Sequence, residues 1–140
     1  MISFTVPGEP QGKARARTFQ NKYTGKTTTT TPDKTVLYEN LIKLSYNQTC
    51  KTIFEPDKPL EMTVRAYYSI PKSYTKGKRL AAEHNIIRST KKPDADNILK
   101  VVADALNKTA YNDDTQIVRA VVEKYFGEVA RVEVELREVV

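Results

Sequence analysis

The spacing of apolar residues in the last third of the chain limits its fold more than any other feature. Over residues 96–107, four polar side chains fall within about 80° of one another at 100° per residue, and they are Asp96, Lys100, Asp104 and Asn107. The opposite face is apolar and consists of Ile98, Leu99, Val101, Val102, Ala105 and Leu106. This pattern predicts an amphipathic helix with one face in the core and one available for chemistry.

We expect this helix to begin near Asp96, because Pro93 disfavours the helical conformation for the residue before it. The Asp96 carboxylate could then cap the backbone N–H of Ile98 or Leu99. After the helix, residues 116–125 and 130–137 have the composition of strands, with Gly127 in the short connection between them.

The rest of the chain adds further strands and a second main helix. Residues 2–6 and 60–70 are expected to be strands, and 17–21 with 27–31 a ragged hairpin. A helix over 34–48 follows from a mostly three-to-four spacing of Val36, Leu37, Asn40, Leu41, Leu44 and Tyr46, and residues 73–85 could add a short basic helix. The sequence thus predicts a single α+β domain, 1–140, with a small mixed sheet of about four main strands and two principal helices on one face.

Charge is distributed unevenly along this chain, whose net charge is +6. Residues 1–31 carry net +4 and residues 72–92 net +6, whereas residues 93–140 carry net −4. Basic segments of this kind favour binding to the phosphate backbones of nucleic acids. No stretch approaches the roughly 20 apolar residues that cross a bilayer, so we expect a cytoplasmic protein without a membrane partner.

The acidic residues are placed where they could bind a metal ion. Asp94 and Asp96 lie just before the predicted helix, and Asp113 and Asp114 lie at the turn before the next strand. Carboxylates without His or Cys ligands favour Mg²⁺, or else Mn²⁺, over zinc. In a basic protein this set suggests metal-assisted phosphodiester hydrolysis, with Lys100 offsetting carboxylate repulsion and supporting the charge that develops on the phosphate.

Each of these features also has a purely structural explanation. An Asp before a helix is commonly a cap, an Asp-Asp pair commonly makes a turn, and an Asp–Lys pair four residues apart is commonly a surface ion pair. The competing class is therefore a non-catalytic basic DNA-binding module that needs no metal. A metal nuclease of broader branched-DNA specificity is a third possibility.

The string KPDADNILKVVADALN (92–107), followed by DDTQI (113–117), resembles the signature of RusA-type Holliday junction resolvases. This resemblance implies a small homodimeric, Mg²⁺-dependent endodeoxyribonuclease, common in phages and prophages, that resolves four-way DNA junctions by paired nicks in recombination and repair. It assigns catalysis to Asp94, Asp96, Lys100 and Asp114, with Asp113 as an accessory metal ligand. The chain departs from the family pattern at Lys108, where Gly is common, and at Ala16, where Pro is common.

Two groups of basic residues are candidates for contact with junction DNA. Lys13, Arg15 and Arg17 follow the Pro-Gly turn near the N-terminus, and Lys91 and Lys92 directly precede the acidic motif. Such residues would contact phosphates and position a duplex arm without reading its sequence. A solvated charged face is the alternative. Tyr67, Tyr68 and Tyr74 could stack on bases, but tyrosines on a strand more often pack, so we leave them out of the site.

Overall fold

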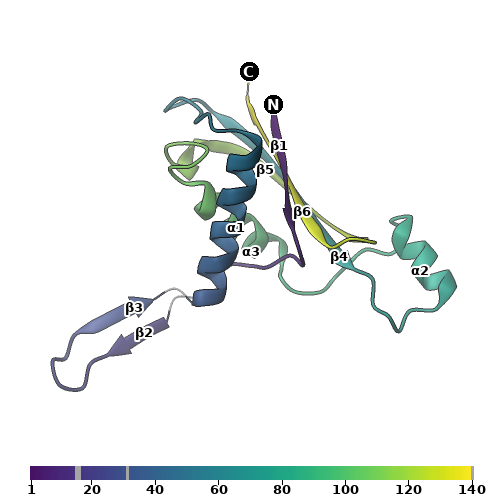
Figure 1. Ribbon diagram of the computed structural model, residues 1–140, viewed down its shortest axis with the longest axis horizontal. Helices are drawn as coiled ribbons and strands as arrows, with labels where there is room; N and C mark the ends of the chain where they lie inside the picture. The colour runs from purple at the N-terminus through teal and green to yellow at the C-terminus, as the bar shows by residue number, and fades with distance from the viewer. Residues whose placement is uncertain (15–16, 31, 140) are drawn as a thin grey trace.

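The fold is built on a four-stranded mixed sheet, which the computed structural model shows edge-on (Figure 1). The structure describes residues 1–14, 17–30 and 32–139. The strands are β1 (Ile2–Pro7), β4 (Leu60–Ser69), β5 (Ile117–Gly127) and β6 (Arg131–Glu138), in the spatial order β1-β6-β4-β5. Strand β6 runs antiparallel to β1 and β4, whereas β5 runs parallel to β4. A parallel pair needs a long crossover, and this one contains α2 (Lys76–Glu83) and α3 (Ala95–Leu106).

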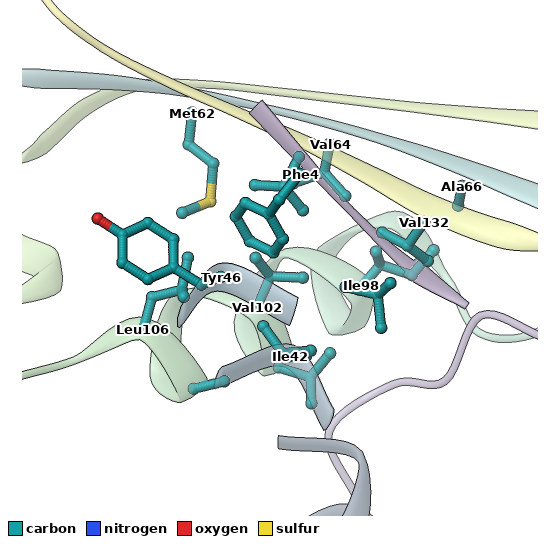
Figure 2. Packing of buried hydrophobic residues seen from close by; sticks show 14 of the residues in the cluster. Phe4, Ile42, Tyr46, Met62, Val64, Ala66, Ile98, Val102, Leu106 and Val132 are labelled. Carbon is teal, nitrogen blue, oxygen red and sulfur yellow. The ribbon is translucent and has the colours of Figure 1, made fainter. Parts of the chain in front are cut away.

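The core lies between one face of the sheet and two helices, α3 and α1 (Asp33–Thr49). Figure 2 shows side chains of all three parts meeting there: Ile42 and Tyr46 come from α1, Ile98, Val102 and Leu106 from α3, and Phe4, Met62 and Val64 from the strands. The Phe4 and Tyr46 rings meet edge to face with centroids 5.5 Å apart. Because α3 is fixed by this core, its polar face has a defined position at the surface.

Two further elements extend from this body. Strands β2 (Arg17–Gln20) and β3 (Thr27–Thr30) form an antiparallel hairpin that projects beside the start of α1, and α2 lies at the opposite end of the molecule's long axis (Figure 1). Among the described residues, no helix combines the length and apolar character that spanning a membrane requires.

The predicted α+β class and mixed sheet are confirmed. The hairpin also forms, with Arg17 opposite Thr30, although Thr31, the last residue predicted for it, lies outside the described part of the chain. The prediction that Gly127 lies in a connection is wrong, because Gly127 is the last residue of β5. Strands β5 and β6 are consecutive in the chain, yet β4 lies between them.

The prediction for the first helix is correct in its position and partly wrong about its buried face. Helix α1 packs through Tyr38, Ile42 and Tyr46, whereas Leu37 is 69% exposed and Leu44 is 54% exposed. Val36 is also exposed. The apolar positions of this segment span two faces, and the larger aromatic side chains, which bury more apolar area than Leu, occupy the core side.

Helix α3 begins one residue earlier than predicted, so Asp96 is not its cap. Asp94 is the N-cap residue, and Asp96 lies in the first turn. There the negative charge of its carboxylate interacts favourably with the positive end of the helix dipole. The two faces predicted for the helix are confirmed, because Ile98, Val101 and Leu106 are buried while Asp96 and Lys100 are exposed.

Candidate active site

The start of α3 presents two carboxylates to solvent. Asp94 has an extended backbone, with φ −73° and ψ 164°, and its carbonyl accepts the N–H of Ile98 at 3.1 Å. Its side chain makes no capping hydrogen bond, and both Asp94 and Asp96 are exposed. Capping therefore does not occupy the Asp94 carboxylate, which leaves its oxygens free for an external ligand.

A groove of about 800 Å³ adjoins this end of the helix. Its walls come from the loop after β1, the start of α1 and the start of α3, and they include Gly12, Lys34, Lys92, Asp94 and Asn97. The loop is tied to α3 by the Lys13 N–H, which donates to the Asn97 carbonyl at 3.3 Å. The groove thus combines a carboxylate with lysine side chains, which suits a phosphate bridged by a cation.

Gly12 makes the close approach of loop and helix possible. A Cβ at this position would lie 2.9 Å from the Pro93 Cβ and 3.0 Å from the Asn97 Cβ. The Gly12→Ala variant should therefore lose about 1–3 kcal/mol of stability through overpacking, and the phosphodiester cleavage that the sequence predicts should slow because the loop moves away from α3. Urea denaturation and a cleavage assay measure the two effects.

Gly77 provides the matched control, since nothing lies within 4 Å of a Cβ added there. It is inside α2, so Gly77→Ala should leave cleavage unchanged and raise stability by up to about 1 kcal/mol. A Gly12→Ala protein as stable and active as the wild type would contradict the packing argument.

Lys13 links the loop to both helices. Its Nζ lies 2.7 Å from Glu39 Oε1 and 3.4 Å from Asp104 Oδ2, and Lys100 Nζ lies 3.5 Å from the same Asp104 oxygen. Burial opposes the charge on Lys13, but the hydrogen bond and charge of Glu39, together with Asp104, raise the pKa of the ammonium. Lys13 was predicted to contact DNA, and here its ammonium is engaged by two carboxylates.

The far end of α3 carries the second carboxylate pair. Asp113 Oδ1 accepts the N–H of Thr115 at 3.2 Å and caps the short 3-10 helix η1 (Asp114–Gln116), so Asp113 has a structural role. The Asp114 N–H donates to Asn107 Oδ1 at 2.9 Å, which joins this turn to the end of α3. The Asp-Asp pair is therefore held against the helix.

These two carboxyl groups differ in their ionisation. Burial, followed by the hydrogen bond and negative charge of Asp113, raises the pKa of Asp114. The Thr115 N–H, followed by the hydrogen bond with Asp114, lowers the pKa of Asp113. The nearby charge of Asp104 adds to the effect on Asp114. A cation at this end of α3 would relieve the repulsion among these groups.

The two carboxylate pairs lie at opposite ends of α3. The helix spans Ala95–Leu106, which corresponds to about 18 Å at 1.5 Å per residue. Contacts with β4 show the same separation. Tyr68, late in β4, donates its hydroxyl hydrogen to the Pro93 carbonyl at 2.8 Å, just before the first carboxylate pair. Ile117, just after the second pair, is opposite Leu60 at the start of β4. Within the described part of one chain, no three His, Cys, Asp or Glu side chains come close enough to hold a metal ion.

The remaining predicted residues occupy different surroundings. Lys100 is exposed and lies one turn from both Asp96 and Asp104, and Lys91 and Lys92 are exposed in the loop before α3. Arg15 and the side chain of Arg17 lie outside the described residues.

The structure adds residues that were not assigned to the site. Glu39, Asn97 and Asp104 contact or adjoin the predicted set. Asp104 had a signal in the sequence, because it lies one turn after Lys100 on the polar face of the helix, and Asn97 belongs to the string that carries the family resemblance, whereas Glu39 had none. The tyrosines left out of the site pack within the fold: Tyr67 stacks on Tyr125, Tyr68 is buried, and Tyr74 meets Phe126 edge to face.

Comparison with known proteins defines the class of this protein. The profile of the family described as Endodeoxyribonuclease RusA matches residues 7–137. The chain belongs to the RusA endodeoxyribonuclease family, which confirms the predicted enzyme class and sets aside the non-catalytic binding module. It is 40% identical to "Uncharacterized protein YqaN" of Bacillus subtilis (strain 168), over 99% of this chain and 96% of that protein. It is 34% identical to "Crossover junction endodeoxyribonuclease rusA" of Lactococcus phage r1t, over 64% of this chain and 62% of that protein.

Proposed function

We propose that this protein is a divalent-metal-dependent endonuclease that resolves four-way DNA junctions by paired nicks. The observation that carries the proposal is the pair of solvent-exposed carboxylates at the start of α3, Asp94 and Asp96, because the Asp94 side chain makes no capping hydrogen bond. They adjoin a groove that contains Lys34 and Lys92. Membership of the RusA family, and the crossover junction activity in the name of the phage relative, support the choice of substrate.

The donor set is suited to Mg²⁺ or Mn²⁺, because carboxylate oxygens are the ligands these ions prefer. Asp94, Asp96 and Asp114 would hold the ion, with Asp113 accessory to them. When bound, such an ion activates water and stabilises charge on the phosphate oxygens. Lys100 is exposed and one turn from Asp96, so its ammonium can approach a scissile phosphate beside these carboxylates.

Other side chains position this machinery. Lys13 holds the loop, α1 and α3 together through Glu39 and Asp104, and Asn107 fixes the backbone of Asp114. Lys92 and Lys34 on the groove wall can neutralise phosphates of the strand that enters it. The basic loop at Lys91 and Lys92 directly precedes the carboxylates, so DNA bound there lies next to them.

We infer further that the working form is a homodimer in which each site draws on both chains. One chain offers two partial carboxylate sets at opposite ends of α3, a helix about 18 Å long. If two α3 helices meet antiparallel across a two-fold axis, the Asp94 and Asp96 end of one protomer faces the Asp114 end of its partner. Two identical sites result, as paired nicks in a nearly symmetric junction require.

The experiment that tests the proposal uses a labelled synthetic four-way junction beside linear duplex of the same sequence. The wild-type protein, with Mg²⁺ present, should introduce symmetric nicks in the junction, and EDTA should abolish them. Equal cutting of duplex, flap and junction would replace the proposal with a nuclease of broader branched-DNA specificity. Junction binding without any cutting, across varied junction sequences and with Mn²⁺ as well, would overturn it.

A further inference from the structure

We propose that the β2–β3 hairpin is a duplex-binding arm that holds one arm of the DNA substrate beyond the catalytic groove. The hairpin projects from the body next to the start of α1 (Figure 1), and Ala14 and Pro32, which flank it in the chain, line the groove that contains Asp94. This inference rests on the proposed nuclease function. It assigns a DNA-contacting role to an element that the catalytic residues do not explain.

Charge is the first argument for this assignment. No acidic residue occurs between Glu9 and Asp33, whereas this stretch contains five Lys or Arg residues. Lys22 and Lys26 lie at the end of the hairpin and are exposed to solvent, and neither side chain has a carboxylate partner among the described residues. Ammonium groups that are free of internal partners gain most by displacing counterions from DNA phosphates.

The tip is ordered by its own hydrogen bonds although nothing packs over it. The Asn21 side chain accepts the N–H groups of Tyr23 at 2.8 Å and Thr24 at 3.3 Å, and the Asn21 carbonyl accepts the N–H of Gly25 at 2.8 Å. Gly25 has a φ of +69°, which glycine adopts without strain. The backbone of the turn is therefore held in one conformation by contacts within the hairpin itself.

Tyr23 is the side chain that this turn directs outward, and it is 99% exposed. A fully exposed aromatic ring contributes nothing to the core, so the fold itself does not explain it. Tyrosine hydroxyls and threonine hydroxyls are common donors to DNA phosphates. Thr27 and Thr28, on the neighbouring strand, are exposed as well. The tip thus carries two ammonium groups and several hydroxyl groups with no acidic residue among them.

The dimensions of the hairpin suit a duplex. Strand β2, Arg17–Gln20, extends about 13 Å at 3.3 Å per residue, which corresponds to roughly four base pairs along B-DNA, and the turn lies beyond it. A two-stranded ribbon is also of a width that the major groove accepts. With its base at the groove and its tip roughly four base pairs or more away, the hairpin would lengthen the contact along one arm without reading sequence at the cleavage point.

The test compares wild type with the Lys22→Gln/Lys26→Gln double variant and with Tyr23→Ala. Each is measured for binding to a four-way junction in EDTA over a range of salt concentrations, and for hydroxyl-radical protection along the arms. The double variant should lower the slope of log affinity against log salt by about 1.8, at about 0.9 per phosphate contact, and weaken binding on the order of tenfold. Both variants should lose protection on the outer part of one arm.

Lys51→Gln is a surface-lysine control that removes one positive charge away from the hairpin, because Lys51 is exposed at the other end of α1. Its salt slope and footprint should match the wild type. If the hairpin variants also match the wild type while the wild type cuts junctions with Mg²⁺, the arm is not a DNA contact and the proposed function stands. If the wild type neither binds nor cuts junctions, both proposals fail.

Discussion

Replacing Asp96 with Asn is expected to lower the rate of junction cleavage by about a thousandfold or more and to leave junction binding intact. A bound metal ion supplies several kcal/mol of transition-state stabilisation, and each 1.36 kcal/mol corresponds to a factor of ten in rate. Asp94→Asn and Asp114→Asn should behave in the same way. Single-turnover cleavage in Mg²⁺ and gel-shift binding in EDTA measure the two quantities separately.

Binding should persist, or become tighter, because each change removes a negative charge near the DNA and no phosphate contact. Asp96 is exposed and the Asp94 side chain does not cap its helix, so each substitution should cost the fold no more than about 1 kcal/mol, from the lost interaction with the helix dipole. Glu128→Gln, an exposed carboxylate beyond β5, is a control that should retain full cleavage. Wild-type rates in all three Asn variants would remove these carboxylates from the active site, and loss of folding in all three would mean that their role is structural.

The sequence predicted the elements of the fold well because their signals are local. Strand β6 alternates Val132, Val134 and Leu136 with charged residues, and those three side chains are buried. Helix α3 keeps its apolar residues on one face over its whole length. A period of two or of 3.6 residues is a property of a short segment, so it can be recognised without any knowledge of distant contacts.

The errors occurred where distant parts of the chain decide the outcome. Leu37 and Leu44 fit an amphipathic helix, yet the sheet accepts Tyr38, Ile42 and Tyr46 instead. The insertion of β4 between β5 and β6 depends on a crossover through α2 and α3, which no local pattern specifies. Packing and strand order are set by contacts far apart in the chain.

The candidate site shows the same division. The helix that carries Asp96, Lys100 and Asp104, and the polar face on which these residues lie, could be predicted from the spacing of residues alone. The expectation that Asp94, Asp96, Asp113 and Asp114 could bind a metal ion did not include the length of α3, which keeps the Asp94 end apart from the Asp114 end within one chain. Glu39 had no signal in the sequence, because it enters the site only through Lys13 in the loop, whereas Asn97 directly follows Asp96 in the string that carries the family resemblance.

Mixing two inactive variants is expected to restore cleavage if the site is shared between protomers. In a heterodimer of Asp96→Asn and Asp114→Asn chains, one site carries both substitutions, and the other combines an intact Asp96 with an intact partner Asp114. Random assortment gives half heterodimers, so about a quarter of all sites should be functional. Because each heterodimer has one working site, the product should be a singly nicked junction. Denaturing gels of co-expressed, co-purified chains detect it.

The matched control is a mixture of Asp94→Asn and Asp96→Asn chains. Both substitutions lie at the same end of α3, so every site of their heterodimers contains one damaged carboxylate and cleavage should not return. Recovery in the first mixture and none in the second requires that the two ends of α3 act across the dimer. No recovery in either mixture, with heterodimers verified by mass, would place the complete site within one chain, and the α3 region would then have to rearrange when metal and DNA bind, since its carboxylate pairs lie at opposite ends of a helix about 18 Å long.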